Sequence, residues 1–208
     1  MSGKSSYPTY EIESLLMEQE GFKFVVGTDE AGRGSLAGPV VAAAVHIPLE
    51  VVSELLGKVN DSKKIRPKRR EELCELIKAT CSYGIQDISA EIIDEINILE
   101  ATKLAMKSSV EQLEYFDYIL IDGTVDLKKH IICPQKQVIK GDALSLSIAA
   151  ASILAKVTRD RMMLDLHELF PIYGFDEHKG YGTKKHIEAI QLYGASDYHR
   201  FSFRKVGK

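Results

Sequence analysis

The stretch Gly27-Thr28-Asp29-Glu30-Ala31-Gly32-Arg33-Gly34 places two adjacent carboxylates between an apolar run and a glycine-flanked arginine. The apolar run, Phe22 to Val26, is typical of a buried strand. Neighbouring carboxylates at a strand end repel each other unless a cation lies between them, and an all-oxygen site suits a hard ion such as Mg²⁺ or Mn²⁺. The glycines let backbone N–H groups approach an anion, and the arginine can bind phosphate or hydroxyl oxygens. The stretch therefore predicts a metal and phosphate site.

Two other interpretations of this stretch remain open. An Asp-Glu pair after a strand is often a solvated turn, and Gly-x-Gly is often only a tight bend. The glycines after a strand also match part of a dinucleotide-binding fingerprint, which requires a helix to follow. The next segment, Pro39 to Ile47, favours a second strand instead, because it is rich in β-formers at both ends and begins with proline. Binding of NAD(P) would reveal the dinucleotide alternative.

Length and composition indicate an ordinary soluble globular protein. The chain has 208 residues, of which 45% are hydrophobic and 27% charged, and it fits one domain. The longest nearly apolar run, Ala143 to Ala155, is interrupted by serines and too short to cross a bilayer, and the N-terminus has no apolar signal-peptide core. Three cysteines without zinc or redox spacing favour reduced thiols. We therefore expect a cytoplasmic protein that does not bind membranes.

The positive charge is unevenly distributed along the chain. The formal net charge of −3 argues against a protein that coats nucleic acid by bulk attraction. The tail from 178 to 208, however, has seven lysines or arginines against Glu188 and Asp197. A second basic cluster comprises Lys63, Lys64, Arg66, Lys68, Arg69 and Arg70. Such clusters are often only solvated faces, but basic flanks around an acidic centre suit a phosphate-rich polymer held beside a metal site.

The hydrophobic pattern predicts strands that come first and then alternate with helices, as in an α/β sandwich with a mixed sheet. The expected strands cover 22–27, 40–47, 116–121 and 131–138, and the expected helices cover 9–20, 67–80, 90–114, 142–170 and 184–194. Thr9 is a possible cap of the first helix, and small residues in the fourth helix permit close packing against a sheet.

Further acids follow the predicted elements at informative points. Asp122 comes directly after a strand, and Asp142 is at the head of a helix. Taken alone, Asp122-Gly123 could open a turn and Asp142 is better explained as a helix cap. If the strands that precede Asp29 and Asp122 lie side by side and parallel, their ends bring the acids to one sheet edge. Four carboxylates there would suit two divalent ions and in-line phosphodiester hydrolysis.

Together these motifs resemble type 2 ribonuclease H, the bacterial ribonuclease HII family. The resemblance extends from about residue 22 to 204 and rests on the following stretches in family order: 29–34 with 36–40, 61–64, 121–123, 140–142, 151–160, 173–175 and 178–183. Ser35 departs from the more usual proline, which removes no ligand. The related type 3 enzymes usually have an extra N-terminal domain and glutamate as the fourth acid, so Asp142 favours type 2.

The resemblance implies a ribonuclease H-like fold: a mixed five-stranded sheet flanked by helices, in a single domain over residues 1–208, with a helical C-terminal part from about 160 that contributes to substrate binding. It implies an endoribonuclease that cuts the RNA strand of RNA–DNA hybrids and nicks 5′ to ribonucleotides in duplex DNA, leaving 5′-phosphate and 3′-hydroxyl ends. Removal of ribonucleotides and RNA primers would be its roles. We expect a monomer without an organic cofactor. The alternative is a non-catalytic hybrid-binding module of the same fold.

The resemblance also assigns residues. It implies that two Mg²⁺ or Mn²⁺ ions are bound by Asp29, Glu30, Asp122 and Asp142, with Asp29 bridging both. It implies that Gly32, Arg33 and Gly34 hold the backbone and 2′-hydroxyl of the scissile ribonucleotide. Tyr181 is expected to pack on the next sugar and to sense the same hydroxyl, although it could equally be a loop anchor. Phosphate contacts are expected from Lys63, Lys64 and Lys179.

Overall fold

A five-stranded mixed sheet forms the centre of the computed structural model, which describes residues 7–207. The strand order is β3-β2-β1-β4-β5. The central strand β1 is antiparallel to β2 and parallel to β4, and Thr28 pairs with Ile121 across the parallel pair. The condition for bringing Asp29 and Asp122 to one sheet edge is therefore met. The strands are β1 (Val25–Ala31), β2 (Val40–His46), β3 (Ser82–Ile88), β4 (Tyr118–Asp122) and β5 (Gln135–Val138).

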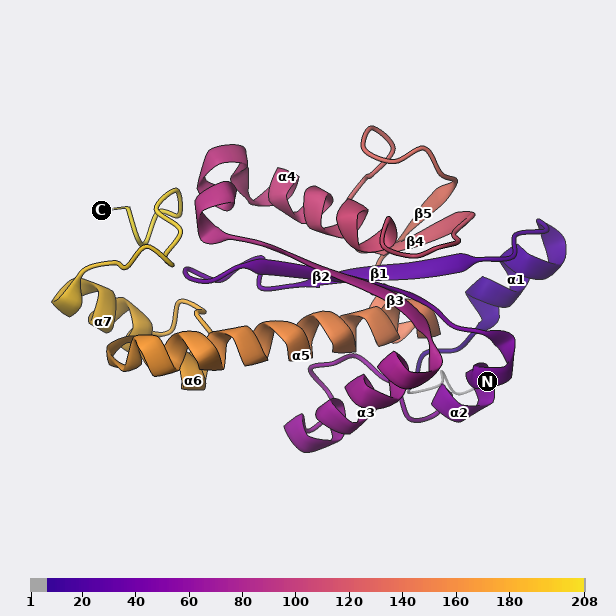
Figure 1. Cartoon of the computed structure of the whole chain (residues 1–208), viewed down its shortest axis with the longest axis horizontal. Coiled ribbons are helices and arrows are strands. Elements are labelled where there is room, and N and C mark those ends of the chain that lie inside the picture. Colours follow the sequence, from indigo (N-terminus) through magenta and orange to yellow (C-terminus); the bar gives the residue numbers. More distant parts are fainter. Residues whose placement is uncertain (1–6, 208) are drawn as a thin grey trace, which may run out of the picture.

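Helices cover both faces of the sheet (Figure 1). The long helix α4 (Ala90–Val110) lies on one face, and α3 (Pro67–Thr80) and α5 (Leu146–Leu169) lie on the other. Each face buries its own apolar cluster, since side chains alternate along β2: Ala43 and Val45 pack towards α3 and α5, whereas Ala42 and Ala44 pack towards α4. The remaining helices are α1 (Glu11–Gln19), α2 (Leu49–Leu55), α6 (Phe175–His178) and α7 (Lys184–Tyr193).

Helix α5 packs unusually close to the central strand. A Cβ at Gly27 would lie 2.3 Å from the backbone nitrogen of Ile148, so only glycine permits this approach. The first turns of α5 are rich in alanine and serine and are almost completely buried. The small-residue segment singled out in the sequence thus serves close packing, as expected, and it brings the N-terminus of α5 beside the carboxyl end of β4.

The C-terminal part lies at the end of the sheet where β1 finishes. Figure 1 shows α6, α7 and the C-terminal segment together at one end of α5, opposite α1. Single β-bridges join Ser35 to Tyr181 and Ala37 to His199, so the segments that follow β1 and α5 meet there. The helical C-terminal part is therefore attached directly to the loop that contains the glycine-flanked arginine.

Several element boundaries differ from the predictions. Strand β1 continues through Ala31, so its two acids lie within the strand rather than after it. Helix α1 begins at Glu11 without a side-chain cap, because Thr9 pairs with Ser145 instead. The cap of α5 is Ser145, whose hydroxyl accepts a hydrogen bond from the N–H of Ile148. The prediction that Asp142 caps a helix was wrong, and this acid lies in a separate 3₁₀ turn (Gly141–Ala143).

Strand β3 and helices α2 and α6 were not predicted. Helix α4 is also shorter than expected and bends at Asn97, whose backbone has a φ of 67°. All three cysteines are free thiols, as expected, with Cys74 and Cys81 buried. Within residues 7–207, no helix combines the length and apolar character needed to cross a membrane.

Candidate active site

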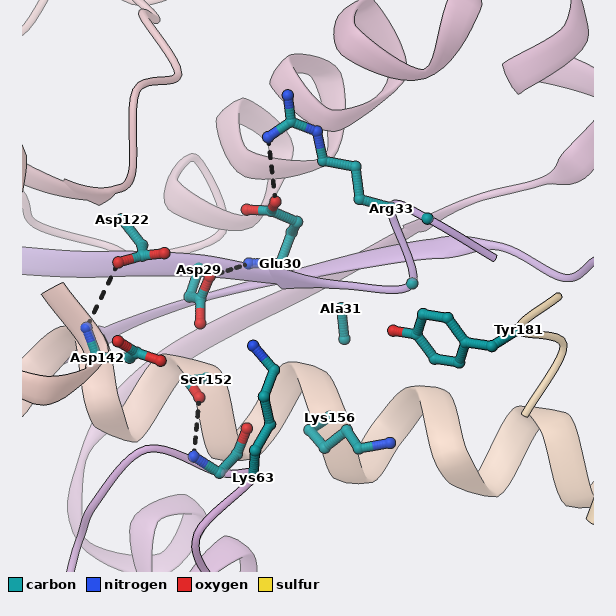
Figure 2. A pocket seen from close by; sticks show the side chains of 13 residues that line it. Asp29, Glu30, Ala31, Arg33, Lys63, Asp122, Asp142, Ser152, Lys156 and Tyr181 are labelled. Carbon is teal, nitrogen blue, oxygen red and sulfur yellow. Dashed lines mark hydrogen bonds and ion pairs between the residues drawn. The ribbon is translucent and has the colours of Figure 1, made fainter. Parts of the chain in front are cut away.

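The four predicted acids line one cavity at the end of the central strands. Asp29 and Glu30 come from the last part of β1, Asp122 is the last residue of β4, and Asp142 lies in the 3₁₀ turn before α5. The cavity has a volume of about 450 Å³. Figure 2 shows Asp122 and Asp142 on one side of Asp29 and Tyr181 on the other. The fold therefore brings together four carboxylates of which the first, Asp29, and the last, Asp142, are 113 positions apart in the sequence.

Hydrogen bonds fix the two later acids relative to each other. Oδ1 of Asp122 accepts hydrogen bonds from the backbone N–H groups of Gly141 at 2.7 Å and of Asp142 at 3.4 Å. The end of β4 is thereby joined to the turn that presents Asp142. On β1, Oδ1 of Asp29 accepts a hydrogen bond from the N–H of Glu30 at 2.7 Å. Each of these carboxylates keeps a second oxygen for other partners.

The acid cluster is electrostatically unfavourable by itself. Asp29 is only 8% exposed, and burial, followed by the charges of Glu30, Asp122 and Asp142, raises its pKa well above the usual value. Burial also raises the pKa of Glu30, although Arg33, 3.5 Å away, opposes the shift. The pKa of Asp142 is raised by burial and then by Asp122. A bound cation would relieve this repulsion. Asp29 and Asp122 each interact with all three other acids, and Asp29 is the most deeply buried of the four.

The donor set fits a divalent metal ion of the hard class, since every ligand would be a carboxylate oxygen. Asp29, Glu30, Asp122 and Asp142 are the residues that could hold it. Although the four acids line one cavity, no three histidine, cysteine or acidic side chains of the described residues are already placed around a single metal position.

Most, but not all, of the predicted substrate contacts line the same cavity. Gly32, Arg33, Gly34, Lys63 and Tyr181 do, and Figure 2 shows Lys63 reaching from its loop towards the space beside Asp29. The predicted contacts Lys64 and Lys179 do not line it: Nζ of Lys64 lies 3.8 Å from Asp61, and Nζ of Lys179 donates to the backbone carbonyl of Asp176. The cavity is also lined by four residues that were not predicted, namely Ala31, Ser62, Ser152 and Lys156.

Lys156 is the most informative of the missed residues. It lies on α5 and its Nζ is 2.6 Å from Oδ1 of Asp160, whose other oxygen is 3.5 Å from Arg70 of α3. The ion pair holds a second lysine at the cavity wall, in addition to Lys63. A lysine four residues before an aspartate on a helix is a common surface pair, so the spacing alone gave no sign of this position.

Two buried arginines support the loop that follows β1. Arg159 of α5 donates hydrogen bonds to the backbone carbonyls of Ala37, Pro39 and Lys179, over 2.9–3.1 Å. Arg200 donates to the carbonyls of Arg33 and Gly38 over 2.9–3.1 Å. Both are at most 1% exposed, and neither forms an ion pair within the described residues. The arginines thus fix the backbone of the glycine-arginine loop by binding its carbonyl groups.

Arg159 also contacts the ring of Tyr181. The guanidinium of Arg159 lies 5.6 Å from the centre of the Tyr181 ring, and the backbone of Tyr181 is bridged to Ser35. Its ring is 41% exposed at the cavity, so it can contact a ligand as well as anchor the loop. The two interpretations of Tyr181 are therefore compatible.

Three histidines cluster next to Tyr181 without lining the cavity: His186 and His199 are buried and His178 is half-buried. His186 lies 3.1 Å from His199 between their Nε2 atoms, and its Nδ1 lies 3.0 Å from the carbonyl oxygen of Tyr181. His178 stacks on His186 with ring centres 4.5 Å apart. Burial lowers the pKa of His186 to about 4, so its ring is neutral near pH 7. Through His186, this cluster holds the backbone of the loop that contains Tyr181. None of the three histidines lines the acid cavity.

A buried acid cluster at one edge of a mixed sheet, with lysines and an exposed tyrosine around it, defines a metal-dependent phosphodiester hydrolase. Comparison with known proteins makes this class specific. The sequence profile of the Ribonuclease HII family matches residues 26–206. Ribonuclease HII of Caldicellulosiruptor saccharolyticus is 50% identical over 94% of this chain and 94% of its own length. Ribonuclease HII of Geotalea uraniireducens is 54% identical over 94% of this chain and 89% of its own length.

Solved structures agree with the sequence comparisons. The ribonuclease HII of Archaeoglobus fulgidus, determined in complex with PCNA, is 28% identical with a TM-score of 0.75, and the match covers 88% of this chain and 96% of that one. Ribonuclease H2 of Pyrococcus horikoshii OT3 is 26% identical with a TM-score of 0.76, covering 89% of this chain and 96% of that one. The chain belongs to the ribonuclease HII family, and the predicted fold and enzyme class are confirmed.

Proposed function

We propose that this ribonuclease H of type 2 hydrolyses the RNA strand of RNA–DNA hybrids and nicks 5′ to ribonucleotides embedded in duplex DNA, leaving 5′-phosphate and 3′-hydroxyl ends. The observation that carries the proposal is the convergence of the four acids with Arg33, Lys63 and Tyr181 on one cavity. Carboxylates alone would repel a polyanion, whereas the surrounding cations attract its phosphates. Removal of single ribonucleotides and of RNA primers is the role that such a reaction supports.

The acids are the proposed metal-binding and catalytic residues. Asp29, Glu30, Asp122 and Asp142 would hold two Mg²⁺ or Mn²⁺ ions. We expect Asp29 to contact both, because it lies on the central strand β1 and is the most deeply buried of the four. When bound, the ions supply activation of the attacking water and neutralisation of charge on the departing oxygen. The chain's own contribution is to hold the four carboxylates on strand ends and a hydrogen-bonded turn, where they are rigid.

The glycine-arginine loop and Tyr181 are the residues proposed to recognise the 2′-hydroxyl of the ribonucleotide. DNA and RNA differ at the 2′-hydroxyl, which can both donate and accept a hydrogen bond. Gly32, Arg33 and Gly34 line the cavity together with Tyr181, and the buried arginines beneath them fix their positions. A fixed loop distinguishes RNA from DNA better than a mobile one, because its hydrogen-bonding groups cannot move to find other partners when the 2′-hydroxyl is missing. The residues from about 160 onwards would contribute to substrate binding through this loop.

Cleavage of a labelled DNA duplex that contains one ribonucleotide tests the proposal. The duplex is incubated with Mg²⁺, with Mn²⁺ and with EDTA, beside an all-DNA duplex of the same sequence. We expect a nick 5′ to the ribonucleotide that requires the metal and does not occur in the control duplex. Tight binding without a nick in either metal would instead support a non-catalytic hybrid-binding module.

A further inference from the structure

A second cavity, which we call the basic pocket, opens from the loop that also contributes Lys63 to the active site. It has a volume of about 320 Å³, and its charged lining residues are Lys58, Lys64, Arg66 and Arg69. The other lining residues are uncharged, so no carboxylate faces the pocket. Lys63 lines the acid cavity and its neighbour Lys64 lines the basic pocket. One short loop therefore connects two cavities of opposite charge.

The cations of the basic pocket are incompletely neutralised by the protein. Arg69 pairs with Glu72 at 2.9 Å, and Lys64 lies 3.8 Å from Asp61. Across residues 7–207, Lys58 and Arg66 form no ion pair. Like charges gathered around one cavity repel each other unless an anion occupies it, because mutual repulsion disfavours the charged forms. The pocket is therefore suited to an anionic group.

The loop that joins the two cavities is held in place from three directions. Asp61 accepts a hydrogen bond from the N–H of Lys63 at 2.9 Å. Arg70 of α3 donates to the carbonyls of Ser62 at 2.8 Å and of Ile65 at 2.9 Å. The N–H of Ser62 lies 3.4 Å from the hydroxyl of Ser152 on α5. These hydrogen bonds fix the loop and therefore the spacing of the two cavities. The loop then loses little conformational entropy when a ligand binds.

We propose that the basic pocket binds a backbone phosphate of the nucleic acid outside the cleaved position, so that the loop 61–66 holds the substrate at two points. The inference rests on the proposed function, which supplies the polyanion. It also gives Lys64 a role as a phosphate contact at this second pocket instead of at the acid cavity. Four cationic side chains without a carboxylate in the lining suit a phosphate group.

Binding measurements with Lys58→Ala and Arg66→Ala test this pocket. Both side chains are exposed and form no ion pair in the described residues, and Arg66 makes no side-chain cap bond at the start of α3, so neither change should disturb folding. Lys23→Ala is the matched control, because Lys23 is an exposed lysine just before β1, at the opposite end of that strand from the acids, and lines neither cavity. The probe is a ribonucleotide-containing duplex with long flanks, and two further duplexes are shortened on the 5′ or the 3′ side.

We expect each pocket variant to weaken binding of the long duplex by about three- to tenfold and to reduce the slope of log affinity against log salt by about 1, as for one lost phosphate contact. The loss should appear in Kd and KM, and it should disappear on one of the two shortened duplexes. Lys23→Ala should match the wild type throughout. An unchanged salt slope in both pocket variants, or an equal deficit on all three duplexes, would overturn the inference.

Two other outcomes have distinct signatures. If the pocket binds free phosphate instead, inorganic phosphate raises the Tm of the wild type but not of Arg66→Ala, and the duplex salt slope is the same for both, which also overturns the inference. If the proposed function itself fails, the wild type cuts none of the three duplexes. The two failures are therefore distinguishable in one set of measurements.

Discussion

The side chain of Arg159 fills the space that any side chain at Gly32 would need. A Cβ at Gly32 would lie 1.9 Å from Nε of Arg159, and the backbone at Gly32 has a φ of +92°, which favours glycine. The same guanidinium binds three backbone carbonyls and underlies the ring of Tyr181. The glycine in the acid-rich motif is therefore required by the arginine beneath it, independently of any contact with substrate.

Gly32→Ala should destabilise the protein by about 2–4 kcal/mol, because it combines backbone strain with displacement of a buried arginine. Activity should fall with it, since the loop that Arg159 supports lines the acid cavity. Urea unfolding at equilibrium measures the first effect, and cleavage of the ribonucleotide-containing duplex measures the second.

Gly34→Ala provides the matched control for this prediction. Nothing lies within 4 Å of a Cβ at Gly34, and its φ is outside the left-handed region, so its free energy of unfolding should change by less than about 0.5 kcal/mol. Equal destabilisation by both alanines would show that Arg159 does not impose the requirement for glycine.

Asp29→Asn should abolish cleavage while stabilising the metal-free protein. The carboxyl of Asp29 is buried and its pKa is raised by burial and by three neighbouring acids. A raised pKa in the folded state means that the folded protein binds the proton more tightly than the unfolded chain does. Stability from this group is therefore present at low pH and lost as pH rises through the folded pKa. The neutral amide of asparagine does not ionise, so this loss of stability does not occur. We expect the free energy of unfolding of the metal-free protein to rise by about 1 kcal/mol near pH 7.

Thermal unfolding in EDTA at several pH values measures this effect, and the gain should shrink as the pH falls and the wild-type carboxyl becomes protonated. Asp165→Asn makes the same chemical change at an exposed position and should alter neither stability nor activity. Mg²⁺ or Mn²⁺ should then raise the Tm of the wild type more than that of Asp29→Asn. A destabilised Asp29→Asn in EDTA would contradict the electrostatic account of the cluster.

The sequence predicted the placement of the acids because strand ends are local features. An apolar run that finishes in Asp-Glu, and another that finishes in Asp-Gly, identify β1 and β4 without knowledge of the rest of the chain. Their parallel pairing was only a condition in the sequence, and the structure supplies it. The helix from Pro67 to Thr80 was likewise correct at both ends, since proline in the first turn is a strong local signal.

Features that depend on tertiary contact could not be predicted in this way. Strand β3 has only two buried residues among seven, and so its apolar pattern is weak. Asp142 looked like a helix cap, but Asp122 holds its turn apart from α5 and Ser145 takes the cap. The roles of Arg159 and Arg200 arise from carbonyl groups that are distant in sequence, and no spacing rule indicates them.

Tyr181→Phe and Tyr181→Ala should separate the two roles of this side chain. Phenylalanine keeps the ring above Arg159 and removes only the hydroxyl, so it should reduce the preference for a ribonucleotide over a deoxyribonucleotide. Alanine removes both and should chiefly impair cleavage at a single embedded ribonucleotide. Because the ring is partly exposed, neither change should cost more than about 1 kcal/mol of stability.

Cleavage rates of the two Tyr181 variants on a long hybrid and on a single-ribonucleotide duplex provide the comparison. A selective loss on the single-ribonucleotide duplex is the expected result. Equal losses on both substrates would indicate that Tyr181 only anchors its loop.

Lys156→Ala should lower kcat/KM by about tenfold or more, because it removes a fixed cation from a cavity that must accept a phosphate beside four carboxylates. Lys156→Arg keeps the charge and should retain part of the activity. Lys107→Ala is the matched control: Lys107 also forms an i,i+4 ion pair, with Glu111, but on α4 and outside the acid cavity. Each alanine should change the free energy of unfolding by at most about 0.5 kcal/mol. Steady-state cleavage of the single-ribonucleotide duplex, measured beside urea unfolding, distinguishes the two lysines. If the two alanine variants had the same kcat/KM, Lys156 would be a surface pair like Lys107 and would not act on the substrate.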